Sequence, residues 1–384
     1  MMAVSSSNRN DVSVRKVTST KHGLEVDFTN GAESAFFSWL WLRDHGTDAE
    51  SLDRETQQRK VDTFNLPADL NARQASLELS KNQLNIEWSD DVSSSVDLNL
   101  LLSVKGYTPA PYQLVPSVSR QLWDHTRPLQ QLPTVGYENV METKDGLVAW
   151  LEQIVAYGFS IVEGVPSTDE ATVLLAERLG TPQETLFGTM WHLSSDLTDH
   201  GDTAYSTQYL DPHTDGSYYH DAPGLQLFNC QQFDGKGGES VQVDGYALAE
   251  LVRAEDPEAY ETLYKVAVPG QYLEPGVHVR AERPVFKLSA NGTVEQVTFN
   301  NYDRAPFQLP PEQEELFYRA YRLFHKHSSD QRNWLKIPLR PGMTLIFDNW
   351  RNLHGRMGYV GKRVLYGCYH SRATFESRVR TVSS

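Results

Sequence analysis

LDPHTDGSYY, residues 210–219, places a histidine and an aspartate two positions apart, between a proline and a pair of tyrosines. Side chains at positions i and i+2 lie on the same face of an extended segment, so His213 and Asp215 can approach one ligand together. His-x-Asp is also short enough to arise by chance, and a polar surface turn is its more common setting. The pair therefore predicts a metal site only if the rest of the chain supplies a third ligand.

The best candidate for that third ligand is His354, in the stretch LIFDNWRNLHGRMGY (residues 345–359). It follows an apolar run that is typical of a buried strand, and it precedes a glycine. A mononuclear iron(II) oxygenase binds its metal through two neutral imidazoles and one carboxylate on one side, which leaves three coordination sites for reactants. Alone, His354 is more typical of a core or loop histidine. With His213 and Asp215, it completes the ligand set of such an iron site.

An arginine supports the same interpretation. In GKRVLYGCYH (residues 361–370), Arg363 stands at the start of an apolar strand, where a lone buried charge would be costly. A planar guanidinium pairs with a carboxylate through two hydrogen bonds, and 2-oxoglutarate carries such a carboxylate at the end away from its metal-chelating keto acid. The alternative is a structural salt bridge to an Asp or Glu of the chain.

The composition excludes several classes of protein. The chain of 384 residues has a net charge of −15, whereas a nucleic-acid binder needs a basic face to displace the counterions of phosphate. Two cysteines, Cys230 and Cys368, are too few for a disulfide scaffold or a multi-cysteine zinc site, and we expect both to be buried thiols. No apolar run reaches signal-peptide length at the N-terminus or membrane-spanning length elsewhere. We therefore expect a cytoplasmic protein that binds neither nucleic acid nor membrane.

Hydrophobic periodicity predicts two domains joined by a linker. Short strand patterns fill a small β-rich N-terminal domain over residues 1–107, including the aromatic run FFSWLWLRDH (36–45). Residues 108–135 are rich in Pro and Ser or lack a period, and are predicted to be the linker. Residues 136–384 contain many evenly spaced strands, such as the alternating ESVQVDG (239–245), with flanking helices. One helix is predicted in DGLVAWLEQIVAYG (145–158) and stops at Gly158, and two more are predicted after Asp244, over 246–265 and 310–327. This pattern indicates a mainly β catalytic domain with flanking helices, a double-stranded β-helix or jelly roll.

The motifs together resemble a known family. DPHTDGSYY (211–219), NWRNLHGR (349–356) and KRVLYGCYHSR (362–372), in this order, are similar to the 2-oxoglutarate-dependent oxygenases of the γ-butyrobetaine and trimethyllysine hydroxylase family. WLRDHG (41–46) and QRKVDTF (58–64) resemble the small N-terminal domain of that family, so the resemblance covers nearly the whole chain. It implies that His213, Asp215 and His354 bind Fe(II), and that Arg363, with Ser240, holds 2-oxoglutarate. It further implies O2 as co-substrate, stimulation by ascorbate, and a homodimer.

The resemblance also implies a substrate with a trimethylammonium group and an anionic tail. An aromatic cage suits this cation, because the cation cannot donate a conventional hydrogen bond. The residues implied for the cage and its charge are Phe187, Trp191, Asp202, Tyr205 and Tyr369, and those implied for the tail are Asn300, Asn301 and Arg304. Aromatic residues such as Phe187 and Trp191 could also be ordinary core residues.

Two features of the chain bear on its place in the family and on the substrate. Family members often carry a zinc site of three cysteines and one histidine after WLRD, whereas this chain has no cysteine there, so we expect its N-terminal domain to hold together by packing alone. The motifs GDTAY (201–205), NNYDRA (300–305) and GCYHSR (367–372) are closer to the trimethyllysine branch, whereas the missing cysteines and the missing mitochondrial presequence indicate a bacterial member. We therefore rank 2-trimethylaminoethylphosphonate or γ-butyrobetaine as substrate before trimethyllysine. Three rival classes stay open: a taurine-type dioxygenase without the cage, a cupin-like binding protein, and a zinc hydrolase, which would need a general base beside the metal.

Overall fold

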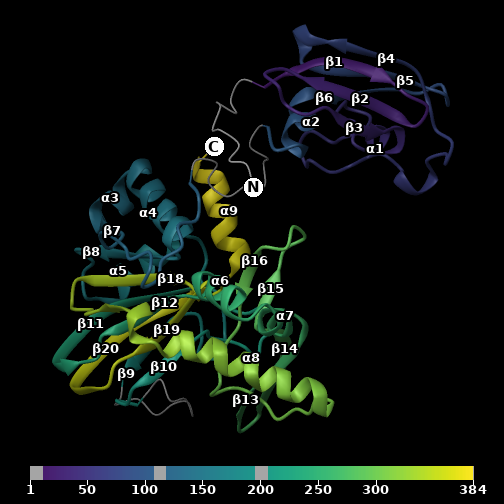
Figure 1. The fold of residues 1–384 in the computed structure, drawn as a ribbon. Helices are drawn as coiled ribbons and strands as arrows, with labels where there is room; N and C mark the ends of the chain where they lie inside the picture. Colours follow the sequence, from purple (N-terminus) through teal and green to yellow (C-terminus); the bar gives the residue numbers. More distant parts are fainter. Residues whose placement is uncertain (1–11, 108–117, 195–205, 384) are drawn as a thin grey trace. The chain divides into compact units, whose positions relative to one another are not determined.

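The computed structural model describes residues 12–107, 118–194 and 206–383, and divides into two compact units, Met1–Gln113 and Leu114–Ser384 (Figure 1). The division falls within the linker predicted over residues 108–135, part of which lies outside the described residues. The predicted boundaries of the domains themselves stay a prediction. Each unit has its own hydrophobic core.

The N-terminal unit contains two three-stranded antiparallel sheets and two short helices, α1 and α2. Its core includes Trp39 and Trp88, whose rings meet edge to face at 6.2 Å. The strands are β1 Val14–Ser19, β2 Gly23–Phe28, β3 Ala35–Ser38, β4 Ala72–Glu78, β5 Gln83–Trp88 and β6 Ser93–Asp97, and the helices are α1 Trp39–Asp44 and α2 Leu98–Val104.

Two expectations for this unit were wrong. The aromatic run 36–45 is not one strand, because the Ser38 hydroxyl accepts a hydrogen bond from the backbone N–H of Trp41 and so begins helix α1. Packing is also not the only force that holds the unit. The Asp48 carboxylate accepts hydrogen bonds from the backbone N–H of Ser51 and of Ser95, at 3.1 and 2.9 Å, and so ties the loop after α1 to strand β6.

The C-terminal unit is built on two facing sheets, which confirms the predicted jelly roll. The six-stranded sheet has the order β7-β8-β18-β11-β20-β9, and the four-stranded sheet has the order β10-β19-β12-β17. Neighbouring strands come from distant parts of the chain, as in β11 between β18 and β20. The bounds are β7 Thr134–Gly136, β8 Phe159–Glu163, β9 Trp191–Ser194, β10 Leu210–His213, β11 Leu225–Gly237, β12 Ser240–Asp244, β17 Leu335–Ile337, β18 Met343–Asp348, β19 Asn352–Arg356 and β20 Tyr359–His370.

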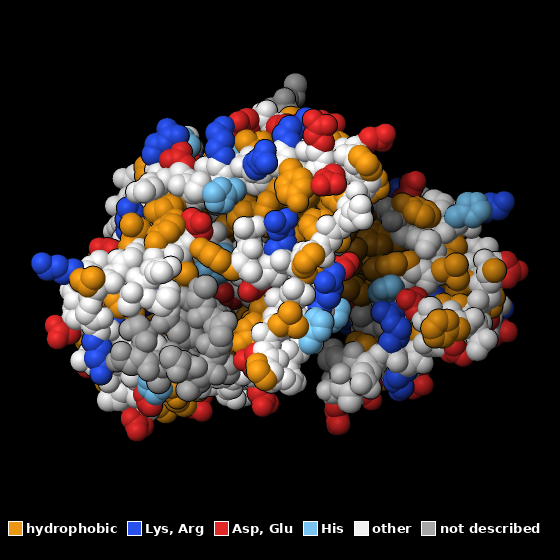
Figure 2. All heavy atoms as spheres, turned by 90° about the horizontal axis from the view of Figure 1, so that it is seen from below, with side chains coloured by type: hydrophobic (Ala, Val, Ile, Leu, Met, Phe, Trp, Pro, Cys, Tyr) orange, Lys and Arg blue, Asp and Glu red, His pale blue; other side chains and the backbone are white. Residues whose placement is uncertain are grey.

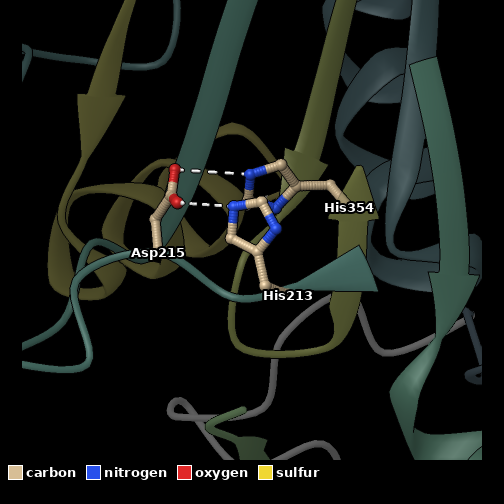
Figure 3. A group of neighbouring side chains, drawn as sticks. All are labelled: His213, Asp215 and His354. Carbon is tan, nitrogen blue, oxygen red and sulfur yellow. Dashed lines mark ion pairs between the residues drawn. The ribbon is translucent and has the colours of Figure 1, made fainter. Parts of the chain in front are cut away.

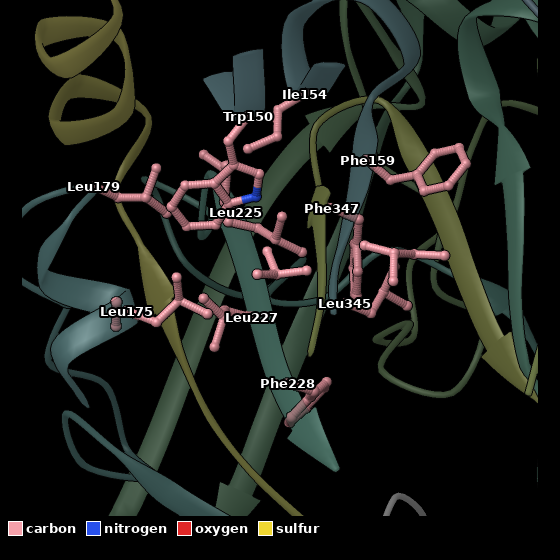
Figure 4. Close-up of a cluster of buried hydrophobic side chains, with 14 of the residues drawn as sticks. Trp150, Ile154, Phe159, Leu175, Leu179, Leu225, Leu227, Phe228, Leu345 and Phe347 are labelled. Atoms are coloured by element: carbon pink, nitrogen blue, oxygen red, sulfur yellow. The ribbon is translucent and has the colours of Figure 1, made fainter. Parts of the chain in front are cut away.

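Three helices cover the outer face of the six-stranded sheet: α4 Lys144–Tyr157, α5 Asp169–Glu177 and α9 Arg372–Ser383, with the short α3 Tyr137–Glu142 beside α4. Trp150 and Ile154 of α4 pack with Leu225 and Leu227 of β11 in the main core (Figure 4). Helix α4 ends at Gly158, which adopts φ 80°, a left-handed conformation that favours glycine. The sequence predicted this helix and its end.

A second group of helices covers the outer face of the four-stranded sheet: α6 Gly245–Glu255, α7 Pro257–Lys265 and α8 Pro311–Ser329. The single helix expected over 246–265 was wrong. The Asp256 carboxylate caps a new helix by accepting the N–H of Ala259, and Pro257, which lacks an N–H, occupies its first turn. Two hairpins follow, β13 Ala267–Glu274 with β14 Val277–Pro284, and β15 Phe286–Leu288 with β16 Val294–Val297.

Strand alternation separates the two faces of each sheet. In β12, Val241 and Val243 pack against the helices, whereas Ser240 and Gln242 line a cavity between the sheets. In β20, alternate residues from Arg363 through Leu365 to Tyr369 line the same cavity, because successive side chains of a strand point to opposite faces. The jelly roll therefore places polar side chains in the space between its sheets.

The surface agrees with the acidic composition. On the face drawn in Figure 2, Lys and Arg side chains are scattered among acidic and apolar ones rather than gathered into one basic area. Within the described residues, the structure contains no helix of the length and apolar character that crossing a membrane would require. Both cysteines, Cys230 and Cys368, are free and buried, as expected.

Candidate metal centre

Three side chains from two neighbouring strands and a turn meet in the cavity. His213 ends strand β10 and pairs directly across the ladder with His354 of strand β19, while Asp215 follows in the turn after β10. The Nε2 atom of each histidine lies 3.4 Å from an oxygen of the Asp215 carboxylate (Figure 3). One donor atom from each of the three residues lies within 4.8 Å of the donor atoms of the other two. The structure thus brings together the three residues that the sequence predicts as metal ligands.

Hydrogen bonds orient these groups toward a common centre. The Nδ1–H of His213 donates to the backbone oxygen of Asp211 at 2.7 Å, which leaves the Nε2 lone pair directed into the cavity. The Nδ1 atom of His354 is buried and makes no hydrogen bond in the described part of the chain. Two imidazole nitrogens and one carboxylate on one side of a space are the donor set that suits iron(II) with open positions. The residues therefore fit such a metal.

The protonation of the three groups is coupled. Burial disfavours the charge of Asp215, but the two imidazoles outweigh it and hold the pKa of Asp215 well below its usual value. Burial lowers the pKa of His354, which favours the neutral form that can bind a metal. Burial also opposes the charge of His213, but the hydrogen bond and charge of Asp215 raise its pKa overall. The carboxylate is thus ionised at neutral pH, as a metal ligand must be.

Asp215 is held in place by Asn349 and Tyr369, two residues that the sequence did not connect with the metal site. The Asn349 side chain accepts the backbone N–H of Asp215 at 2.8 Å and donates to its backbone oxygen at 3.0 Å. The hydroxyl of Tyr369 donates to the Oδ2 atom of Asp215 at 2.6 Å. Asn349 belongs to the same stretch that pointed to His354, but no spacing in the sequence shows which backbone an asparagine will bind.

One wall of the cavity is positively charged. Arg363 is 4% exposed, and its Nη2 atom donates to the hydroxyl of Ser240 at 3.4 Å. No carboxylate among the described residues forms an ion pair with Arg363, so the predicted alternative of a structural salt bridge finds no partner there. Burial lowers the pKa of Arg363 to about 10, and the nearby charges of Arg356 and Arg340 add to this effect. A buried guanidinium without a carboxylate partner among the described residues favours the binding of an anionic ligand.

Another wall is aromatic. The Trp191 ring lies 4.6 Å from the ring of Tyr369 and 6.1 Å from that of Phe187, and all three line the cavity. Tyr218, which sequence reasoning did not select, also lines it. Asp202 and Tyr205, the other two residues predicted for the cage, lie outside the described residues.

The segment FNNYDRA contributes differently from expectation. Asn300 lines the cavity, together with Tyr302 and Asp303, which sequence reasoning did not select. Asn301 is exposed and is not among the residues that line the cavity. The guanidinium of Arg304 lies over the ring of Tyr321 at 5.5 Å, and Arg304 does not line the cavity either. Roles for Asn301 and Arg304 in substrate binding stay predictions without support from this geometry.

Comparisons with known proteins agree with the motifs. The family model described as taurine catabolism dioxygenase TauD, TfdA family matches residues 125–369, and the one described as gamma-butyrobetaine hydroxylase-like, N-terminal matches residues 15–98. Mitochondrial trimethyllysine dioxygenase of Mus musculus is 35% identical over 88% of this chain and 80% of its own. Gamma-butyrobetaine dioxygenase of Pseudomonas sp. is 28% identical over 93% of each chain. These matches confirm the resemblance that the motifs indicated.

A solved structure gives a more distant likeness. A putative alpha-ketoglutarate-dependent taurine dioxygenase from Burkholderia xenovorans covers 64% of this chain and 91% of its own, with a TM-score of 0.49 and 14% identity.

Proposed function

The chain belongs to the TauD/TfdA family of dioxygenases, and we propose that it is an iron(II)- and 2-oxoglutarate-dependent hydroxylase of a small trimethylammonium compound with an anionic tail. One observation carries this proposal. A single cavity combines the group His213, Asp215 and His354 with a buried arginine and an aromatic wall. The three parts suit a metal, an anionic co-substrate and a cationic substrate, respectively.

The residues of the chain have separate tasks in this proposal. His213, Asp215 and His354 would hold iron(II), and Arg363 with Ser240 would hold the distal carboxylate of 2-oxoglutarate. When bound with 2-oxoglutarate and O2, the iron supplies the oxidising power that inserts one oxygen atom into a substrate C–H bond, with release of succinate and CO2.

The cavity walls have a part in the same reaction. Leu345, Phe347 and Leu365 also line the cavity, and their apolar surface limits the access of water to the reacting carbon. In this proposal, the protein positions the substrate carbon and surrounds it with apolar side chains.

The aromatic wall supports a trimethylammonium substrate. The rings of Trp191 and Tyr369 pack on each other at 4.6 Å with an interplanar angle of 37°, and both line the cavity, so this wall offers π-electron density to a quaternary ammonium group. The relatives named above act, by their names, on trimethyllysine and on γ-butyrobetaine. The higher identity to the trimethyllysine enzyme, 35% against 28%, favours trimethyllysine as the first compound to test, in place of the order suggested by the missing cysteines.

A turnover assay tests the proposal. The protein is incubated with Fe(II), ascorbate, 2-oxoglutarate and O2, and succinate and product mass are followed for trimethyllysine, γ-butyrobetaine, 2-trimethylaminoethylphosphonate and taurine. We expect one trimethylammonium compound to gain one oxygen atom with an equal amount of succinate, and we expect His354→Ala to lose this activity. Turnover of taurine alone would instead support a taurine-type dioxygenase and would contradict the role of the aromatic wall in binding a trimethylammonium group. Activity that persists in His354→Ala, or that needs no O2, would contradict the iron site.

A homodimer and a cytoplasmic location stay predictions. Light scattering coupled to gel filtration of the full chain would measure the first, and a mass of one chain would contradict it.

A further inference from the structure

Tyr369 is in contact with both the aromatic wall and the metal group. It lies on strand β20 opposite Gln226 of β11, with its side chain on the inner face of the sheet. Its ring packs on Trp191 at 4.6 Å, and its hydroxyl donates a hydrogen bond of 2.6 Å to Oδ2 of Asp215. The residue is 6% exposed, so water competes little for this bond.

The two oxygens of the Asp215 carboxylate therefore have different surroundings. Oδ1 lies 3.4 Å from Nε2 of His213, whereas Oδ2 lies 3.4 Å from Nε2 of His354 and also receives the hydroxyl of Tyr369. A carboxylate oxygen that accepts a short, charge-assisted hydrogen bond is a poorer metal ligand, because its electron density is already shared. The Asn349 side chain binds the backbone N–H and C=O of Asp215 and so holds the carboxylate in place. Rotation about the Cβ–Cγ bond only exchanges two equivalent oxygens, so one oxygen always faces the hydroxyl of Tyr369.

We propose that Tyr369 is a positioning residue that keeps Asp215 a monodentate metal ligand through Oδ1. A carboxylate that bound through both oxygens would occupy a fourth position on a six-coordinate metal. A keto acid that chelates through two atoms and a molecule of O2 need three positions, so only a monodentate Asp215 leaves enough. The inference rests on the proposed metal role of His213, Asp215 and His354, and it adds a function for the hydroxyl beyond that of the ring.

The test compares Tyr369→Phe with Tyr366→Phe. Tyr369→Phe keeps the aromatic ring and removes only the hydroxyl that reaches Asp215. Tyr366 is on the same strand, packs on His192 at 4.3 Å and is not among the residues that line the cavity, so its variant is a matched control. Binding of Mn(II) is measured by electron paramagnetic resonance of the free ion, without substrate or turnover, and Co(II) absorption reports the coordination of the metal.

We expect Tyr369→Phe to release Oδ2 to the metal and to change the Mn(II) dissociation constant by about 10- to 100-fold, the usual scale for removing a group that orients a metal ligand. The Co(II) visible bands should change shape and intensity in Tyr369→Phe and stay as in the wild type in Tyr366→Phe. Equal Mn(II) affinity and an unchanged Co(II) spectrum in Tyr369→Phe would overturn the inference. A wild-type protein that binds neither ion would instead contradict the proposed function itself.

A second comparison guards against a folding defect. Asp215→Ala is combined with Tyr369→Phe, so that no carboxylate oxygen is left without its donor. If the hydroxyl acts through Asp215, the double variant should bind Mn(II) as weakly as Asp215→Ala alone, and not more weakly. A further loss of about tenfold in the double variant would show that Tyr369 acts elsewhere in the cavity and would also overturn the inference.

Discussion

Replacement of Arg363 by methionine is expected to weaken 2-oxoglutarate binding while leaving the ligand-free protein as stable as the wild type or more stable. The guanidinium is buried, and among the described residues it contacts the neutral Ser240 hydroxyl and the ring of Tyr359 rather than a carboxylate. The lowering of the Arg363 pKa to about 10 corresponds to a cost of about 3 kcal/mol for keeping the charge in place. Methionine has a similar length and no charge, so part of this cost should be recovered on substitution.

The loss in binding follows from the same geometry. A bound carboxylate would pair with the guanidinium in a site with little water, and removing one partner of such a pair costs about 3 kcal/mol. At 1.4 kcal/mol per factor of ten, the dissociation constant of 2-oxoglutarate should rise about 100-fold. We expect the free energy of unfolding of the ligand-free protein to rise by about 1 kcal/mol, since the substitution removes a buried charge that pairs with no carboxylate of the described residues.

Calorimetric titration of the Mn(II)-loaded protein with 2-oxoglutarate, without O2, measures the first quantity, and urea unfolding without metal measures the second. 2-Oxobutyrate lacks the distal carboxylate, so its affinity should be the same in the wild type and in Arg363→Met. Arg340→Met removes a nearby charge that does not line the cavity and should leave the 2-oxoglutarate affinity within about twofold. Unchanged 2-oxoglutarate affinity in Arg363→Met, together with a loss of several kcal/mol in stability, would refute the reasoning and make Arg363 a structural residue.

Three further outcomes are expected. Trp191→Ala should raise the dissociation constant of the trimethylammonium substrate about 30-fold, from a cation–π energy of about 2 kcal/mol, with no change for 2-oxoglutarate. Calorimetry measures both, and equal losses for the two ligands would indicate general damage. Arg351→Met should lower the free energy of unfolding in urea by about 3–5 kcal/mol, because it leaves the buried Asp244 carboxylate without its partner at 2.8 Å; a loss below 1 kcal/mol would contradict this. Mn(II) at 100 times its dissociation constant should stabilise the wild type by about 2.7 kcal/mol, and this gain should be absent in His354→Ala if the three residues hold the metal.

The sequence predicts the architecture because strand alternation and glycine stops are local signals. Apolar residues at every second position of β12 and a helix that ends at Gly158 both appear in the structure as the pattern indicates. The errors are local too. At Ser38 and at Asp256, a capping side chain began a helix where the wider pattern of apolar residues suggested one continuous element.

The site was only partly predictable, for a different reason. His213, Asp215 and His354 could be found because a metal requires particular donor types, whatever the spacing between them. The bond from Tyr369 to Asp215 depends instead on the packing of strand β20 against the turn after β10, which are 154 residues apart. Arg304 lies away from the cavity, where its backbone pairs with Gly270 of hairpin strand β13. No sequence motif indicates this pairing.

The inward positions of β20 also fix the spacing between the anion site and the aromatic wall. Arg363 and Tyr369 are six residues apart on one strand, so their Cα atoms are separated by about 20 Å along the strand. One inserted residue between them would turn either the anion site or the cation site away from the cavity, because it reverses the alternation of side chains. Residues off this strand, such as Phe187 and Asn300, line the same cavity and can change without altering the spacing and alternation of β20.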